Sequence, residues 1–267
     1  MPTAEVNGIT INYTDTGGDG TPVLFVHAFP LHSGQWDGQV EVFGDRYRLI
    51  TPDLRGFGSS SAPEDRSAYS MDSFADDLKG LLDELGVERV ILAGLSMGGY
   101  IAFAFLRKYR SAVAGLVLAD TRAEADPPAG IEKRTNQQNQ VESEGTDGLI
   151  EGLTGALLSD HTKSKKPDVV ERVKSLMQNP AAGFIGALEA MKQRPDSTGE
   201  LASIDVPTLV VVGEDDAVTP PDAAETITNA VADSKLITIP GAGHLSNLED
   251  EQTFNEALAE FLGGVGA

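Results

Sequence analysis

Residues 90–100 read Val-Ile-Leu-Ala-Gly-Leu-Ser-Met-Gly-Gly-Tyr, and this stretch indicates the fold. Its first four residues predict a strand buried on both faces, and the residues from position 100 onward predict a helix. Gly94 and Gly98 carry no side chain where the strand and the helix must pass closely, so the Ser96 hydroxyl can project from a strained turn. Ser96 is therefore a candidate nucleophile, and the competing interpretation is a turn without chemistry.

The length and the hydropathy restrict the class of protein. The chain has 267 residues, which suits one large α/β domain or one domain with an inserted subdomain. No stretch reaches the ~20 consecutive apolar residues of a membrane span, so we expect no membrane partner. Residues 1–16 lack the basic start and apolar core of a signal peptide, which predicts a cytoplasmic location.

Charge and residue usage exclude several kinds of chemistry. The net charge of −21 would repel phosphate backbones, so we expect no nucleic-acid partner. The absence of cysteine removes thiol nucleophiles, disulfides and cysteine metal sites. The four histidines, at positions 27, 32, 161 and 244, show no metal-ligand spacing, and we predict no metal site. Serine, histidine and carboxylates remain as the catalytic options.

Strand-like and helix-like runs alternate along most of the chain. This alternation predicts a mostly parallel sheet with helices on both faces. Residues 122–200 differ, because they contain several helix-like runs broken by proline or glycine and no strand-like run. We therefore predict a core made of residues 1–121 and 201–267, with a helical cap at 122–200 inserted between the sixth and seventh strands.

Ligands of such sheets bind beyond the carboxyl ends of the strands, so residues that follow strands are the candidates for chemistry. A serine nucleophile needs a base, and His244 lies in a glycine-flanked loop after the last predicted strand. An imidazole needs an acceptor that fixes its tautomer, and Asp216, after the preceding strand, fits this role best. Asp120 and Asp215 are the alternatives.

The chain order Ser96, Asp216, His244 resembles that of the α/β-hydrolase superfamily. Further matches are the strand and turn at 22–30, the Asp-Leu-Arg-Gly-Phe-Gly-Ser-Ser run at 53–60, the Gly-Glu-Asp-Asp run at 213–216 and the Gly-Ala-Gly-His run at 241–244. The resemblance spans nearly the whole chain. It is closest to small bacterial esterases, cofactor-free perhydrolases and enol-lactonases, and it implies an eight-stranded sheet and no cofactor.

The resemblance also assigns an oxyanion hole to the backbone N–H groups of Phe29 and Met97. Met97 would begin a helix whose dipole favours developing negative charge. The side chains of both residues are expected to line the substrate pocket. One departure from the family is Ala28, where glycine is usual. A methyl group disfavours positive φ, so we expect either a displaced Phe29 amide or a narrower pocket.

These observations predict a serine hydrolase that cleaves a carboxylic ester or lactone through an acyl-enzyme on Ser96, with perhydrolysis as a side activity. The partner would be a small-molecule substrate, and the chain a monomer or homodimer. The alternative is a ligand-binding signalling protein on the same fold, with slow or no turnover.

For several other residues, a structural role competes with a functional one. We expect His27 to be structural, and Asp53 and Arg55 to form a salt bridge or anchor a turn rather than bind substrate. Phe184, Leu188 and Met191 share one helical face, which favours packing within the cap and lining of the pocket about equally.

Overall fold

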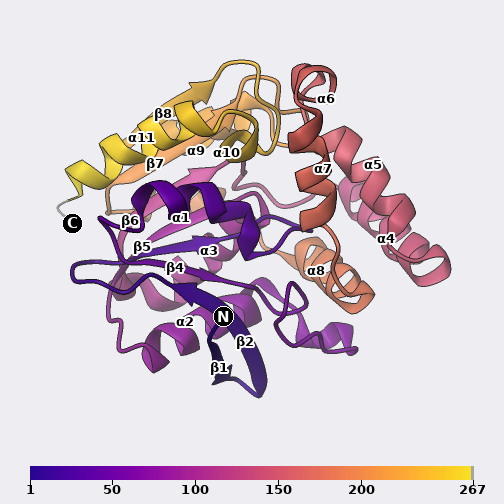
Figure 1. The fold of residues 1–267 in the computed structure, drawn as a ribbon, viewed down its shortest axis with the longest axis horizontal. Coiled ribbons are helices and arrows are strands. Elements are labelled where there is room, and N and C mark those ends of the chain that lie inside the picture. Colours follow the sequence, from indigo (N-terminus) through magenta and orange to yellow (C-terminus); the bar gives the residue numbers. More distant parts are fainter. Residues whose placement is uncertain (266–267) are drawn as a thin grey trace.

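Eight strands form one sheet at the centre of the protein (Figure 1). The structure is a computed structural model and describes residues 1–265. The strand order is β1-β2-β4-β3-β5-β6-β7-β8. The strands have these bounds: β1 Thr3–Val6, β2 Ile9–Asp15, β3 Val23–Val26, β4 Leu49–Pro52, β5 Val90–Leu95, β6 Val113–Ala119, β7 Thr208–Gly213 and β8 Ser234–Ile239.

The sheet is mostly parallel, as predicted. Only the first two strands run against their neighbours: β1 pairs antiparallel with β2, and β2 pairs antiparallel with β4. Every later pairing is parallel. Strands β3, β5 and β7 are buried at every position, because helices cover both faces of the sheet. Their continuous apolar sequences follow from that burial.

The helices of the core lie in two layers (Figure 1). Helices α1 and α11 contact one another on one face of the sheet, and α2 and α3 contact one another on the opposite face. Helix α9 packs on β7 and β8. The core helices have these bounds: α1 Asp37–Phe43, α2 Met71–Glu84, α3 Met97–Tyr109, α9 Pro221–Ala230, α10 Ser246–Glu249 and α11 Glu251–Gly264.

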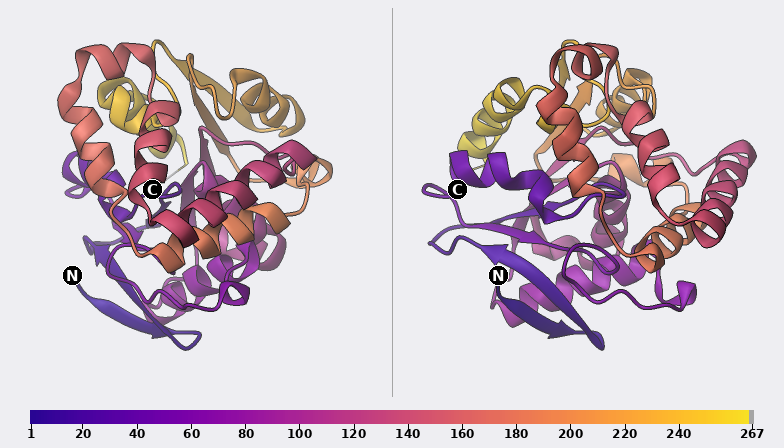
Figure 2. Two further views of the ribbon diagram at one scale, coloured as in Figure 1. Left: turned by 90° about the vertical axis from the view of Figure 1, so that its right-hand side faces the viewer. Right: turned by 45° about the vertical axis from the view of Figure 1, so that its right-hand side comes forward.

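Five α-helices and no strand lie between β6 and β7 in the described chain. They are α4 Pro128–Glu144, α5 Asp147–Leu157, α6 Asp160–Lys165, α7 Pro167–Leu176 and α8 Ala181–Gln193. Several predicted breaks coincide with their ends: Gly145 caps α4 with φ of 81°, Pro167 begins α7, and Pro180 precedes α8. Figure 2 shows these helices at one side of the sheet. Their status as a separate cap domain stays a prediction.

Local sequence signals explain where individual elements begin. Asn7 and Gly8, with φ of 48° and 77°, form the tight turn between β1 and β2, a backbone conformation that these two residue types tolerate best. Helix α2 begins at a capping box, in which the Ser70 and Ser73 side chains each accept the other residue's backbone N–H. Within residues 1–265, no helix combines the length and apolar character needed to cross a bilayer.

The turn after β4 corrects one expectation. Arg55 does not pair with Asp53, and instead donates through Nε and Nη2 to both carboxylate oxygens of Asp77 on α2, at 2.9 and 2.8 Å. Asp53 accepts from the backbone N–H groups of Ser33 and Ser59. The predicted salt bridge was therefore wrong, because N–H groups of nearby turns already occupy the Asp53 carboxylate. The expected role of these residues as turn anchors is confirmed.

Candidate active site

Ser96 lies on the turn between β5 and α3, with φ of 54°. This backbone conformation is strained for a residue with a side chain, and it raises the hydroxyl above the strand end. Two glycines make the turn possible. A Cβ on Gly94 would lie 2.3 Å from the Gly98 carbonyl oxygen, and a Cβ on Gly98 would lie 2.3 Å from the Val26 carbonyl oxygen. Neither position has room for a side chain.

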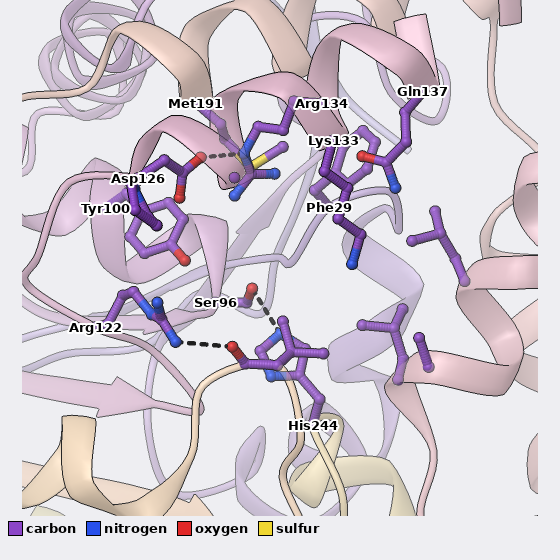
Figure 3. Close-up of a pocket in the computed structure, with 16 residues that line it drawn as sticks. Phe29, Ser96, Tyr100, Arg122, Asp126, Lys133, Arg134, Gln137, Met191 and His244 are labelled. Atoms are coloured by element: carbon purple, nitrogen blue, oxygen red, sulfur yellow. Dashed lines mark hydrogen bonds and ion pairs between the residues drawn. The ribbon is translucent and has the colours of Figure 1, made fainter. Parts of the chain in front are cut away.

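Three side chains from distant parts of the sequence meet at this turn. Nε2 of His244 lies 2.8 Å from Oγ of Ser96 (Figure 3). Nδ1 of His244 lies 2.8 Å from Oδ2 of Asp216. Asp216 follows β7 and His244 follows β8, so all three residues lie beyond the carboxyl ends of parallel strands. With Nδ1 protonated and donating to Asp216, Nε2 is free to accept the Ser96 proton.

Electrostatics favours an imidazole that can take up a proton. Burial by itself lowers the pKa of His244, but the Asp216 charge and its hydrogen bond outweigh burial, so the pKa is raised. Burial likewise raises the pKa of Asp216, and the His244 charge together with hydrogen bonds from His244 and Thr219 reverses this, so that pKa is lowered. Asp216 is therefore a carboxylate at neutral pH.

The three acidic candidates have different surroundings. Asp216 contacts His244, whereas Asp215 is exposed. Asp120 is fully buried and accepts from the Gly213 backbone N–H at 2.9 Å and from the Ser246 hydroxyl at 2.6 Å. Neither oxygen of Asp120 is hydrogen-bonded to His244. Of the three, only Asp216 is placed to fix the imidazole tautomer.

The surroundings of Asp120 favour its neutral form more than those of Asp216 do. Burial, and then the nearby Asp216 charge, raise the pKa of Asp120 to about 8. Two carboxylates so close in a dry interior do not readily ionise together. A neutral Asp120 leaves Asp216 as the negative charge in contact with His244.

Two backbone N–H groups beside Ser96 are available to a ligand. Among the residues that the structure describes, the N–H groups of Phe29 and Met97 have no acceptor. The neighbouring N–H of Ala28 is occupied, because it donates to Oε1 of Gln35 at 2.8 Å. Ala28 is not among the residues with positive φ, so its methyl group imposes no backbone strain. The departure from glycine at this position is therefore sterically accommodated.

A cavity of about 220 Å³ opens at Ser96 and His244. Its apolar wall includes Phe29, Leu153 and Met191. The Met97 side chain is fully buried and is not among the residues that line this cavity, and its predicted substrate contact stays a prediction. The substrate-lining role of Phe29 stays a prediction that its position supports.

The apolar face of α8 is divided between two roles. The Phe184 ring packs against Phe29 with centroids 5.6 Å apart, and Leu188 is fully buried. Met191 lines the cavity. Both of the competing interpretations of this face therefore hold, each for different residues.

His27 is structural, as expected. Its Nε2 accepts the Leu54 backbone N–H at 3.0 Å, and its Nδ1 donates to the Ala28 carbonyl at 3.0 Å. Burial lowers its pKa to about 4, so the ring is neutral. The ring joins the turns after β3 and β4, which carry Phe29 and Leu54.

Sequence reasoning missed the polar part of the cavity wall. Arg122 from the β6 exit and Lys133, Arg134 and Gln137 from α4 all line the cavity (Figure 3). Helix α4 is polar nearly all round, with only Gln138 and Val141 buried. Its sequence therefore contains no periodic signal that distinguishes the cavity-facing side from the solvent-facing side.

Comparison with known proteins identifies the family. The sequence model of the α/β hydrolase fold matches residues 21–251. Among solved structures, a thermophilic esterase from Thermogutta terrifontis is 39% identical, with a TM-score of 0.94 and coverage of 100% of this chain and 99% of that chain.

Two curated proteins extend the similarity. A bifunctional esterase/perhydrolase from Acinetobacter calcoaceticus is 30% identical, over 96% of this chain and 97% of its own length. A 3-oxoadipate enol-lactonase from Acinetobacter baylyi is 28% identical, over 97% of this chain and 95% of its own length. The fold, the motifs and these relatives agree, and the protein is a member of the α/β-hydrolase fold family.

Proposed function

We propose that the protein is a serine hydrolase that cleaves a small carboxylic ester or lactone through an acyl-enzyme on Ser96. The observation that carries this proposal is the continuous hydrogen-bonded chain from Ser96 through His244 to Asp216, with both contacts at 2.8 Å. The names of the relatives, an esterase, an esterase/perhydrolase and an enol-lactonase, support the substrate class.

Acylation follows from the geometry. His244 removes the Ser96 proton as Oγ attacks the carbonyl carbon, and the carbonyl oxygen becomes an anion. The Phe29 and Met97 N–H groups donate to this oxyanion, and each donor contributes about 3 kcal/mol of barrier lowering. The C–O bond to the alcohol then breaks, and the departing oxygen takes the proton from His244.

Deacylation repeats these steps with water. His244 removes a proton from water, whose oxygen attacks the acyl carbon, and the ester bond to Ser96 breaks. The serine oxygen regains a proton from His244, and a carboxylic acid leaves. A lactone reacts in the same way, except that the alcohol stays attached to the acyl group. Hydrogen peroxide in place of water would give a peracid, which is the proposed side activity.

The cavity volume of about 220 Å³ favours a short acyl group. Ligand pockets for drug-sized molecules span about 300–1,000 Å³, so this cavity is smaller than that range. Helices α4, α5 and α8 supply much of the wall. We propose that this cap segment, more than the core, selects the substrate.

The test is burst kinetics with p-nitrophenyl esters of increasing acyl length on the wild type and Ser96→Ala, with intact mass spectrometry. We expect an acyl adduct on Ser96, followed by turnover, and neither in the variant. Adduct formation without turnover would support the signalling alternative instead. No adduct with any acyl length would contradict the nucleophilic role of Ser96.

A further inference from the structure

The charge of the cavity wall has the opposite sign to that of the chain. The protein has 41 acidic residues against 20 Lys and Arg. The cavity at Ser96, in contrast, is lined by three basic side chains, Arg122, Lys133 and Arg134, and by a single acidic one, Asp126. Basic groups gathered at one concave site of an acidic protein create a local positive potential there.

The single acidic side chain of the wall is already neutralised. Asp126 pairs with Arg134, which also lines the cavity, and with Arg194 at 2.8 Å. Burial raises the pKa of Asp126, and the hydrogen bonds and charges of Arg194 and Arg134 outweigh this and lower it. Asp126 therefore offers no charge to a ligand and does not compensate the two other basic groups.

Arg122 has unused donors beside the nucleophile. Its Nη2 donates to the Val218 carbonyl at 2.9 Å, which fixes the guanidinium at the cavity wall. Its Nε is buried without a hydrogen-bond partner, and within residues 1–265 no carboxylate forms an ion pair with the guanidinium. A guanidinium has five N–H donors, and one is used here. A half-buried arginine without a counter-ion is uncommon.

Lys133 stands on the other side of the site. It projects from α4, and among the described residues its ammonium group has no hydrogen-bond or ion-pair partner. Figure 3 shows Lys133 and Arg122 on opposite sides of Ser96. The two cations therefore flank the place where a carbonyl carbon would be attacked.

We propose that the natural substrate is an anionic ester or lactone, whose carboxylate is held by Arg122, while Lys133 on the opposite side of Ser96 adds positive charge to the site. This inference rests on the proposed hydrolase function and specifies its substrate class. The guanidinium supplies directional N–H donors for the carboxylate, and the more exposed ammonium supplies charge. Neither cation contacts Ser96 or Asp216, so both act on binding rather than on proton transfer.

The test compares monomethyl glutarate, which carries a carboxylate, with dimethyl glutarate, which has the same chain and is neutral. Methanol release gives kcat and KM for the wild type, Lys133→Gln, Arg122→Gln and Lys133→Arg. Lys165→Gln is the matched control, because Lys165 lies on α6, outside the cavity, and its substitution changes the net charge equally.

We expect the wild type to prefer the monoester. Lys133→Gln should raise KM for the monoester about two- to fivefold, and Arg122→Gln about tenfold or more. In each variant KM for the diester should rise much less than KM for the monoester. Lys133→Arg should retain the preference for the monoester, and Lys165→Gln should leave this preference unchanged. Raising NaCl from about 10 mM to about 500 mM should raise KM for the monoester and leave KM for the diester nearly unchanged, because salt screens the charges.

Two failures are distinguishable. Hydrolysis of both esters with equal KM, or equal effects of Lys133→Gln on both, would overturn the anionic substrate and leave the serine hydrolase intact. If the wild type neither hydrolysed these two esters and neutral p-nitrophenyl esters nor formed an acyl adduct with any of them, the proposed function would be wrong. This inference would then be wrong as well.

Discussion

Nε2 of His244 lies 2.8 Å from Oγ of Ser96, although 148 positions of sequence separate the two residues. The contact forms because β5 and β8 are parallel and end at the same edge of the sheet. A base held at hydrogen-bond distance from a hydroxyl on a strained turn is the arrangement that nucleophilic catalysis by serine requires.

Asp216→Asn should reduce kcat about 10⁴-fold, because it reverses the imidazole tautomer. Oδ1 of Asp216 accepts the backbone N–H groups of Val218 and Thr219, so the amide oxygen of an asparagine would take that place. Its NH₂ group would then face Nδ1 of His244, which would have to accept and leave the proton on Nε2. Steady-state kinetics with a p-nitrophenyl ester measures the loss.

Asp120→Asn is the matched comparison. We expect about tenfold or less loss of kcat, with a free energy of unfolding lowered by about 1–3 kcal/mol, because Asp120 contacts Gly213 and Ser246 rather than His244. The exposed Asp215→Asn should change neither quantity. A larger kinetic loss for Asp120→Asn than for Asp216→Asn would show that the acid is misassigned.

The pH dependence of kcat/KM should follow His244. The base must be neutral to accept a proton, so the rate rises as pH passes upward through the pKa of His244, which is raised above 6.5. In Asp216→Asn the charge that raises this pKa is gone while the burial that lowers it remains, so the acid limb of the residual activity should move to lower pH. An unmoved or upward-shifted limb would contradict this coupling.

Gly98→Ala should disturb the strand, the turn and the helix together. The new Cβ would lie 2.3 Å from the Val26 carbonyl oxygen, so the backbone must shift. We expect a loss of about 1–3 kcal/mol in unfolding free energy and a marked loss of activity, measured by denaturant unfolding and ester hydrolysis. Gly152→Ala on α5 meets no atom within 4 Å, and it should stabilise the helix by about 0.5–1 kcal/mol with unchanged activity.

His27 should make stability depend on pH. Its pKa falls from 6.5 in the unfolded chain to about 4 in the fold, so between these values the unfolded chain binds an additional proton. The stability that the neutral ring contributes is present above pH 6.5 and is lost as pH falls to 4, by roughly 3 kcal/mol.

His27→Gln keeps an acceptor for the Leu54 N–H without titrating, and it isolates this contribution from other groups. As pH falls from 6.5 to 4, the unfolding free energy of the wild type should decrease more than that of His27→Gln. A difference that stays constant with pH would show that His27 is not held neutral by the fold.

Strand and helix positions were largely predictable because they depend on local patterns. Phe74, Leu78 and Leu81 recur at helical spacing and form the buried face of α2, Met71–Glu84. The apolar run at 90–93 lies within β5, Val90–Leu95. Glycine and proline marked the ends of α4 and α7 because their backbone preferences act locally.

The order of the motifs along the chain carries information about the site. Ser96, Asp216 and His244 each follow a strand, and parallel strands present their carboxyl ends at one edge. Strand order alone does not separate Asp216 from Asp120, because both follow parallel strands. The direction of each side chain decides which carboxylate meets His244, and that direction depends on the loop after the strand.

The sequence by itself determined the fold class, the nucleophile turn and the candidates Ser96, Asp216 and His244, because these follow from local backbone preferences and strand order. Only the tertiary structure decided that Arg55 pairs with Asp77, that Met97 faces the core, and that Arg122 and Lys133 flank Ser96. Such contacts depend on how distant elements pack against one another, and a polar helix such as α4 carries no periodic pattern that reveals which of its faces meets the cavity.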